Sequence, residues 1–173
     1  PGDTGTNNVY DFTAAISDGT NTGSTLTYQV TVTDLNDQTP TYSSSDTTPS
    51  ISEGTTAVET LTVTDTDSAD VNACTLGGTD FASFTCTVSG DSVALAFSSG
   101  NVPDFENPGS ADSDNDYSVT VTISDGTNTG ATIAYTVTVV DANDQTPSYS
   151  AGGLTPSLAE GTTAVDSFTV TDT

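Results

Sequence analysis

The side chains of this sequence that could do chemistry are almost all carboxylates. The 173 residues include 24 Asp and Glu but no Lys, Arg or His, so the formal net charge is −24 at pH 7. These absences exclude a Ser-His-Asp triad, a Schiff-base lysine, a P-loop lysine and a zinc site that contains histidine. They also leave no cationic side chain to contact a nucleic acid or an anionic membrane surface. The carboxylates must be hydrated or neutralised by external cations, and oxygen ligands without nitrogen suit calcium.

The carboxylates recur in short motifs along the chain. The segment Asp34–Pro40 (DLNDQTP) returns as Asp141–Pro147 (DANDQTP), and a Glu-Gly pair begins 13 residues after each proline. A D-x-D pair and a D-x-E pair complete the set. The acidic members outside the two linker segments are Glu53, Glu160, Asp65, Asp67, Asp104 and Glu106. Together the motifs offer carboxylate, amide and carbonyl oxygens, which is the mixture that calcium takes as its roughly six to eight ligands.

An internal repeat organises these motifs. Residues 17–66 and 124–173 are identical at 34 of 50 positions, with a constant offset of 107 and no gap. A period of this length is typical of a small sandwich domain and not of a solenoid unit. We therefore expect residues 1–40 to be the C-terminal part of one repeat, residues 41–147 a complete repeat, and residues 148–173 the N-terminal part of the next. The two partial repeats would need further chain or a neighbouring molecule to complete their sheets.

The elements that must position the motifs are short β-strands. Apolar residues alternate with polar ones, mostly Thr, in residues 26–32, 61–63, 119–123 and 135–139, and large apolar residues alternate with Ala in residues 93–97. Such alternation indicates strands with one face buried, and no segment carries a sustained helical period. About seven strands per repeat, separated by Gly, Asp and Asn turns, predict an all-β fold of tandem, seven-stranded Greek-key β-sandwiches.

The order of the motifs resembles that of the cadherin repeat, and the resemblance covers essentially the whole chain. The shared features are the DxND linker with its Pro, the lone Glu after it, the D-x-D pair and the D-x-E loop. The segment Pro103–Gly126 further resembles the cadherin-like tandem repeats of very large bacterial surface and secreted proteins. In cadherins these motifs meet at the junction between consecutive domains and bind calcium there. The resemblance therefore implies a calcium site at each junction of this chain.

The resemblance also implies which residues are ligands. At the first junction, before the middle repeat, they would be the side chains of Asn36, Asp37, Asp65, Asp67 and Asp125 and the carbonyls of Leu35 and Gln38. At the second junction, after it, they would be the side chains of Glu53, Asp104, Glu106, Asn143, Asp144 and Asp172 and the carbonyls of Ala142 and Gln145. Glu160, the counterpart of Glu53, belongs to the same ligand set, and the Asn72 carbonyl is a looser match. Gln38 and Gln145 stand where cadherins usually have Asn, but this position resembles a backbone ligand. We expect both sites to be incomplete in a single chain.

Several motifs have a purely structural alternative. The linker motif could be a solvated Asn-Asp turn before Pro, and Asp18 and Asp125 could serve only their Asp-Gly turns. Residues 112–116 (DSDND) resemble the start of an EF-hand, but Tyr117 replaces the required Gly and Ile123 the final Glu, so we favour a solvated loop over a weak extra calcium site. Adjacent carboxylates in one loop, without a Trp to stack on a sugar, make a glycosidase pair a poor interpretation of the D-x-E motif.

The two cysteines, Cys74 and Cys86, favour a short disulfide between neighbouring strands. Such a bond would indicate an oxidising, extracytoplasmic compartment. Two free buried thiols are the alternative. No stretch approaches the ~20 apolar residues of a membrane span, so we expect no membrane insertion of this segment.

Together these observations predict a calcium-binding structural repeat of a large extracellular adhesin or filament, stiffened by calcium. Its partners would be neighbouring repeats of the same protein, with homotypic contacts in a fibre, and no nucleic acid. The alternative is a recognition module for a carbohydrate or partner protein, which would need an exposed patch away from the junctions. Tyr42 and Tyr149, behind the linker prolines, are expected to be packed and not free to bind. An enzyme is disfavoured because the chain offers no plausible nucleophile–base pair.

Overall fold

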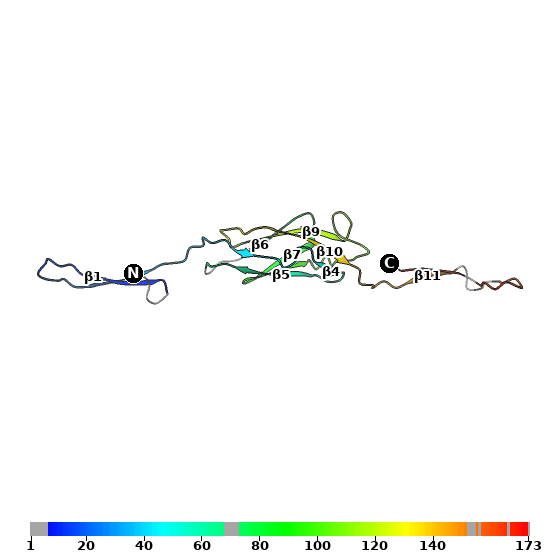
Figure 1. The fold of residues 1–173 in the computed structure, drawn as a ribbon, viewed down its shortest axis with the longest axis horizontal. Coiled ribbons are helices and arrows are strands. Elements are labelled where there is room, and N and C mark those ends of the chain that lie inside the picture. Colours follow the sequence, from blue (N-terminus) through cyan, green and yellow to red (C-terminus); the bar gives the residue numbers. More distant parts are fainter. Residues whose placement is uncertain (1–6, 68–72, 152–154, 156, 166, 173) are drawn as a thin grey trace.

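The computed structural model describes residues 7–67, 73–151, 155, 157–165 and 167–172. It shows an elongated chain with a central body and a two-stranded hairpin on either side of it (Figure 1). The first hairpin comprises β1 (Val9–Ala14) and β2 (Leu26–Thr31), and the last comprises β11 (Ser148–Ala151) and β12 (Phe168–Thr171). None of the described residues form a helix long and apolar enough to span a bilayer.

The central body is a sandwich of two four-stranded sheets. One sheet has the order β4-β10-β9-β6, and the other has the order β3-β5-β8-β7. The strands are β3 (Thr41–Tyr42), β4 (Ser50–Ser52), β5 (Ala57–Thr64), β6 (Ala73–Gly77), β7 (Phe84–Ser89), β8 (Ser92–Phe97), β9 (Asp116–Ser124) and β10 (Ile133–Val140), and a short 3₁₀ helix, η1 (Phe81–Ser83), precedes β7. The predicted all-β sandwich is thus confirmed. Counting β3 and β4 as one strand that is shared between the sheets gives the seven strands expected of this fold.

The core of the sandwich lies where the alternating apolar residues of both sheets meet. On β9 the side chains of Val119, Val121 and Ile123 are each 0% exposed, and the intervening residues face outward. The other buried members are Leu61, Val63, Phe84, Val93, Leu95, Phe97, Tyr117, Tyr135, Val137 and Val139. Period-two patterning in the sequence therefore identified the core-facing side of β5, β8, β9 and β10.

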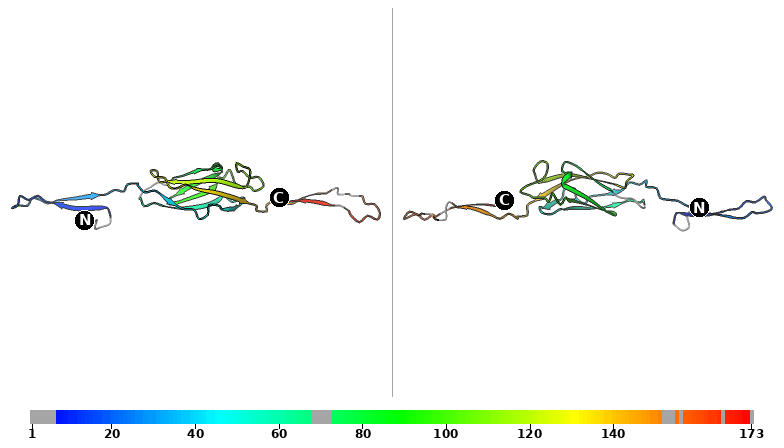
Figure 2. Two further views of the ribbon diagram at one scale, coloured as in Figure 1. Left: turned by 45° about the horizontal axis from the view of Figure 1, so that its top comes forward. Right: turned by 180° about the vertical axis from the view of Figure 1, so that it is seen from behind.

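The two outlying hairpins repeat parts of the sandwich. The pairing Tyr10↔Val30 in the first hairpin has its counterpart 107 residues later in Tyr117↔Val137. In the same way β11 and β12 correspond to β3 and β5. Their apolar side chains are exposed, with Phe12 at 51% and Phe168 at 64%. Figure 2 shows one hairpin at each end of the central body. The boundaries of the repeats themselves stay a prediction.

A disulfide joins the two sheets at one edge of the sandwich. Cys74 on β6 and Cys86 on β7 are bonded, with their Cα atoms 6.1 Å apart. Because β6 and β7 are edge strands of different sheets, the bond links these edges covalently. The predicted disulfide is confirmed, and the alternative of two free thiols is wrong.

At the opposite edge, the loop between β3 and β4 is fixed by a carboxylate. Glu59 on β5 accepts hydrogen bonds from Ser44 Oγ (2.6 Å), Ser45 N (2.8 Å), Ser45 Oγ (2.9 Å) and Tyr135 Oη (2.5 Å). Tyr135 lies on β10 of the other sheet, so this network bridges the sandwich. Partial burial disfavours the charge on Glu59, but the hydrogen bonds from Ser44, Tyr135 and Ser45 together outweigh this effect and lower the pKa of Glu59.

Candidate metal centres

Three carboxylates converge at the second junction. Oxygen atoms of Glu53, Asp104 and Glu106 all lie within 4.8 Å of one another. Glu53 directly follows β4 and is 9% exposed, whereas Asp104 and Glu106 lie on the loop between β8 and β9. The sandwich brings residues about fifty positions apart in the sequence to one end of the domain, where oxygen ligands of a cation could assemble.

The buried member of this group ties the loop to the linker. Glu53 Oε2 accepts a hydrogen bond from the Phe105 amide at 2.8 Å, and Oε1 accepts one from the Ala142 amide at 2.9 Å. These two bonds favour the ionised carboxylate and lower the pKa of Glu53. Glu53 therefore favours its ionised form, and it lies between the D-x-E loop and the second linker.

Glu106 experiences the opposite effect. Desolvation raises its pKa, and repulsion from the charges of Glu53, Asp144 and Asp141 raises it further. Four negative charges thus act on one another at this end of the domain, with no cationic side chain anywhere in the chain to offset them. Asp141 belongs to this group electrostatically, although it is not among the ligands predicted from the sequence. Its position as the first residue of the DxND motif was the signal that could have found it.

The second linker has a turned backbone. Asn143 adopts a left-handed conformation (φ 49°), which Asn tolerates better than most residues, and its amide donates to Asp141 Oδ1 at 2.8 Å. Asp144 Oδ1 accepts a hydrogen bond from Gln145 Nε2 at 2.8 Å. Within the described part of the chain, Asp172 and Glu160 are not members of the close carboxylate group, so their ligand roles stay predictions.

At the first junction a second carboxylate clamps the linker. Asp67 Oδ2 accepts hydrogen bonds from the amides of Asp37 (2.9 Å) and Gln38 (2.7 Å). The Asp67 amide in turn donates to Asp65 Oδ1 at 3.2 Å. The other oxygen of this residue, Asp65 Oδ2, is buried and has no hydrogen-bond partner among the described residues. A buried carboxylate oxygen needs a donor or a cation, so this orphaned atom fits a metal ligand.

The β9–β10 turn brings Asp125 to the same junction. Asp125 is 4% exposed, and its Oδ1 accepts hydrogen bonds from the amides of Thr127 (2.7 Å) and Asn128 (2.6 Å). Desolvation opposes its ionisation, but these bonds outweigh it and lower the pKa of Asp125. Asp18 makes the same turn in the first hairpin, with Thr20 and Asn21 as donors. The turn role of both residues is confirmed, and metal ligation by Asp125 stays a prediction.

One polar contact of this junction was not foreseen. Asn128 Nδ2 donates to Asn36 Oδ1 at 2.7 Å, across 92 positions of the sequence. Asn36 Nδ2 lies 3.5 Å from the carbonyl oxygen of Asp125. The linker residues Leu35, Asn36, Asp37 and Gln38 are thus held beside the residues expected to share a cation with them. Asn72, the looser candidate, lies outside the described residues.

The remaining candidates are structural. Asp114 Oδ1 accepts hydrogen bonds from Ser110 Oγ (3.0 Å) and the Asp116 amide (3.1 Å), which supports the loop interpretation of residues 112–116. Tyr42 is packed as expected, because its hydroxyl accepts a hydrogen bond from the Ile123 amide at 2.9 Å and donates to the Ala131 carbonyl. The same expectation for Tyr149 is wrong, since this residue is 72% exposed.

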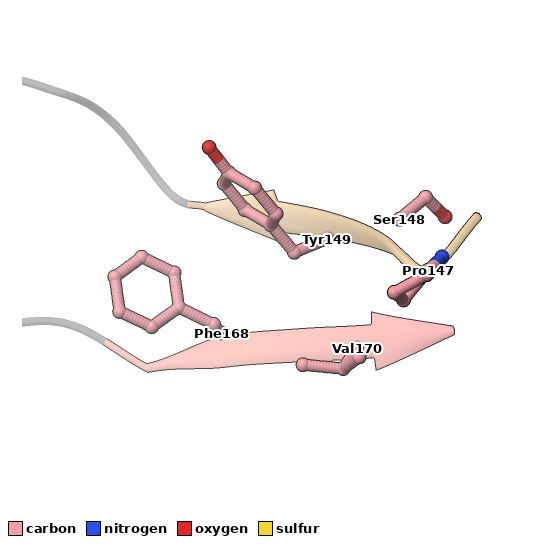
Figure 3. A pocket seen from close by; sticks show the side chains of 5 residues that line it. All are labelled: Pro147, Ser148, Tyr149, Phe168 and Val170. Atoms are coloured by element: carbon pink, nitrogen blue, oxygen red, sulfur yellow. The ribbon is translucent and has the colours of Figure 1, made fainter. Parts of the chain in front are cut away.

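Tyr149 lines an open apolar hollow on the last hairpin. Its other lining residues are Pro147, Ser148, Phe168 and Val170 (Figure 3). Tyr149 lacks the packing of Tyr42 because the strands that cover Tyr42 in the central sandwich have no counterpart beside β11 and β12 in the described chain. The hollow offers no carboxylate and cannot hold a metal ion.

The comparisons with known proteins concern the fold. No protein-family model and no curated protein matches the sequence. The structure resembles human CDH23 EC21-23 with a TM-score of 0.59 at 20% identity, over 95% of this chain and 54% of that one. It resembles protocadherin gammaB7 EC3-6 with a TM-score of 0.57 at 22% identity, over 98% and 41%. For mouse protocadherin-24 EC1-3 the TM-score is 0.54 at 20% identity, over 99% and 58%.

These likenesses establish a cadherin-like fold. The chain spans between two fifths and three fifths of the length of these three solved chains. At such low sequence identity, the similarity shows the fold of this chain and does not show its ligands or partners.

Proposed function

We propose that this chain is a calcium-binding structural segment of a large extracellular adhesin or filament, of the kind formed by cadherin-like tandem repeats in bacterial surface and secreted proteins. Calcium at each junction would join consecutive repeats into a stiffer unit. The observation that carries the proposal is the group formed by Glu53, Asp104 and Glu106, whose oxygens lie within 4.8 Å of one another in a chain without cationic side chains.

The residues at both junctions fit a hard divalent cation. The donor set contains carboxylate, amide and carbonyl oxygens and no nitrogen or sulfur. At the second junction desolvation and then repulsion from Glu53, Asp144 and Asp141 raise the pKa of Glu106, and a cation would relieve this repulsion. At the first junction the orphaned Asp65 Oδ2 needs a partner that the described residues do not supply.

The proposed ligands form two groups. At the first junction they are Leu35, Asn36, Asp37, Gln38, Asp65, Asp67 and Asp125. At the second they are Glu53, Asp104, Glu106, Ala142, Asn143, Asp144, Gln145 and Asp172, and Glu160 would be the first ligand of the next. Calcium would supply positive charge and direct bonds between the loops of one repeat and its linker. The protein's own contribution is to hold those loops and the linker in place through the hydrogen bonds of Glu53 and Asp67.

An extracellular position is supported by the disulfide and by the composition. The Cys74–Cys86 bond would persist in an oxidising compartment. A chain without Lys or Arg also offers no cleavage site to trypsin-like proteases. The remaining negative charge would keep such a polymer hydrated and discourage indiscriminate association.

Thermal unfolding with and without calcium tests the proposal. We expect millimolar calcium to raise the midpoint of the wild-type chain by roughly 5–15 °C over a chelator control, since a ligand that binds only the folded state stabilises it. The variant Glu106→Gln should be at least as stable as wild type in chelator, because it removes one repelling charge. Its gain from calcium should be clearly smaller.

The matched control is Asp112→Asn, which removes an exposed carboxylate outside the close group. This variant should keep the full calcium gain. The proposal would be contradicted if calcium raised none of the midpoints, or if it raised the midpoints of all three proteins equally.

A further inference from the structure

Asn128 makes two kinds of contact from the β9–β10 turn. Its backbone belongs to the turn itself: the amide donates to Asp125 Oδ1 at 2.6 Å, and the carbonyl accepts a hydrogen bond from Ser124 Oγ at 2.7 Å. Its side chain reaches further, since Nδ2 lies 3.1 Å from Asp125 Oδ2 and 2.7 Å from Asn36 Oδ1. The half-buried side chain therefore connects the sandwich to the first linker.

These contacts select one orientation of the Asn36 amide group. Its oxygen faces the Asn128 donor, and its nitrogen faces the carbonyl oxygen of Asp125 at 3.5 Å. The flipped orientation would place two donors together on one side and two acceptors together on the other. An amide oxygen has two acceptor sites, so Asn36 Oδ1 can receive the Asn128 hydrogen bond and still face a cation.

The internal repeat separates the turn role of this residue from its linker contact. Asn21 occupies the same place in the identical sequence SDGTNTG, and its amide donates to Asp18 Oδ1 at 2.7 Å. Its side chain lies 3.4 Å from Asp18 Oδ2, so the local pairing of Asn with Asp is present in both copies. Asn21 is exposed, however, whereas Asn128 is half-buried against the linker.

The linker is also held immediately beside Asn36. The next two residues, Asp37 and Gln38, donate their amides to Asp67 Oδ2. Three consecutive linker residues are thus attached to two separate loops of the sandwich, one through Asn128 and one through Asp67. Two attachments on different loops fix both the position and the direction of the linker.

We propose that Asn128 is a latch that fastens the first linker to the β9–β10 turn without any cation, and that it also positions Asn36 Oδ1 for the cation. The first half of this proposal stands on the hydrogen bonds alone. The second half rests on the proposed function, because it requires a cation at this junction.

Amide hydrogen exchange of the 173-residue chain tests the latch. In chelator, Asn128→Ala should speed exchange in a peptide spanning residues 33–39 by roughly three- to tenfold, the effect of losing one partly buried hydrogen bond. The control Asn21→Ala makes the same change in the same heptapeptide and should leave that linker unaffected. Adding Asn128→Ala to Asn36→Ala should cause no further increase, because the two residues share one bond.

The calcium half is tested by titrating the same exchange signal. The calcium concentration that half-protects residues 33–39 should be roughly three- to tenfold higher in Asn128→Ala than in wild type. The midpoint for residues 140–146 should not move, which provides an internal control. The sandwich should remain folded in the variant, because the turn keeps its backbone bonds to Asp125 and Ser124; unchanged exchange in β9 and β10 checks this.

The outcomes separate the two proposals. Exchange in chelator that is equal in wild type and Asn128→Ala, or equal in Asn128→Ala and Asn21→Ala, overturns the latch. Faster exchange in chelator with an unchanged calcium midpoint supports the latch and overturns the positioning role. If calcium protects neither linker of the wild-type chain, the proposed function fails, and the chelator measurement still decides the latch.

Discussion

At the scale of single residues, Glu59 shows how this chain accommodates a carboxylate without any cationic partner. Hydroxyl and amide donors surround it: Ser44, Ser45 and Tyr135. Such donors stabilise the ionised form, and they fix the loop between β3 and β4 to both sheets. The Tyr135 hydroxyl keeps its proton for the same reason, since burial and the bond to Glu59 raise the pKa of Tyr135.

The Glu59 network predicts a defined pH dependence of stability. The folded-state pKa of Glu59 lies below its ordinary value of 4.5, so the folded protein binds fewer protons than the unfolded chain in this range. The stabilisation is present above the unfolded pKa and is lost as pH falls through the folded pKa. We therefore expect the stability advantage of wild type over Glu59→Gln to shrink between about pH 6 and about pH 3.

Urea unfolding in chelator at a series of pH values measures this difference. Asp91→Asn, in the exposed turn between β7 and β8, is the control and should not reproduce the effect. Parallel curves for wild type and Glu59→Gln would show that the Glu59 network contributes nothing to the pH response.

Residues of the candidate site could be predicted from the sequence only where they belong to a recognisable motif. Glu53, Asp104 and Glu106 belong to motifs with a fixed order, and the structure brings them together. Asn128 could not be found this way, because the turn sequence SDGTNTG indicates only its local pairing with Asp125 and not its contact with Asn36, 92 positions earlier. Contacts across 92 positions depend on how the domain end is shaped, and residue types alone do not record that shape.

At the scale of elements, the fit between the β9–β10 turn and β3 decides how the first linker leaves the sandwich. Gly130 follows this turn, and a Cβ atom built there would lie 2.6 Å from Tyr42 Cε1 and 2.7 Å from the Pro40 carbonyl oxygen. The Tyr42 hydroxyl is held by two hydrogen bonds, one to Ala131 and one from Ile123, so the ring cannot easily move away.

Gly130→Ala should therefore destabilise the sandwich by about 1–3 kcal/mol through overpacking. The control is Gly23→Ala, the same change 107 residues earlier, where the added Cβ would meet a single atom, the Ile16 carbonyl oxygen, at 3.3 Å. Chemical unfolding followed by far-UV circular dichroism measures both variants. Equal and small effects would refute the tight contact at Gly130.

The disulfide between β6 and β7 belongs to the same scale. It closes a loop with a sequence separation of 12 and joins the edges of two sheets. The variant Cys74→Ala/Cys86→Ala should lose about 2–4 kcal/mol of unfolding free energy. Wild-type protein in reducing agent should fall to the same stability, whereas the variant should not respond to the reductant. A reductant effect on both would point to another cause.

The strands were predictable from the sequence where burial of one face produces an alternation of apolar and other residues. The strands β5, β8, β9 and β10 carry alternating core residues, and the sequence indicated each of them. The division of the first strand into β3 and β4 was not foreseen. Thr41–Tyr42 and Ser50–Ser52 are too short and too polar to show a period, and only sheet pairing places them in different sheets.

At the scale of the whole molecule, the chain combines a net charge of −24 with an elongated shape that contains two linkers (Figure 1). Without cations the carboxylates repel one another, and the linkers are held by a few hydrogen bonds. Calcium at the junctions should restrict bending between the central sandwich and its neighbours. We expect small-angle scattering to give a longer and narrower distribution of interatomic distances in calcium than in chelator.

Sodium chloride at matched ionic strength is the control for this measurement, because it screens exposed charges without bridging ligands. The salt should reproduce at most a small part of the change. An identical response to both would mean that screening, and not cation bridging, governs the shape of the chain.

The pairing of β4 with β10 has a consequence for a chain pulled from both ends. These strands are parallel, with Ser50, Ile51 and Ser52 opposite Thr138, Val139 and Val140. Backbone hydrogen bonds connect β4 and the residues that flank it to β10. They run from Thr136 to Thr47, from Thr138 to Pro49 and from Glu53 to Val140. Tension applied through the linkers would draw β4 and β10 in opposite directions along their length and load these bonds together in shear. Separating β4 from β10 would require several hydrogen bonds to break at once. Glu53, which holds the second linker through Ala142, lies at the end of this pairing.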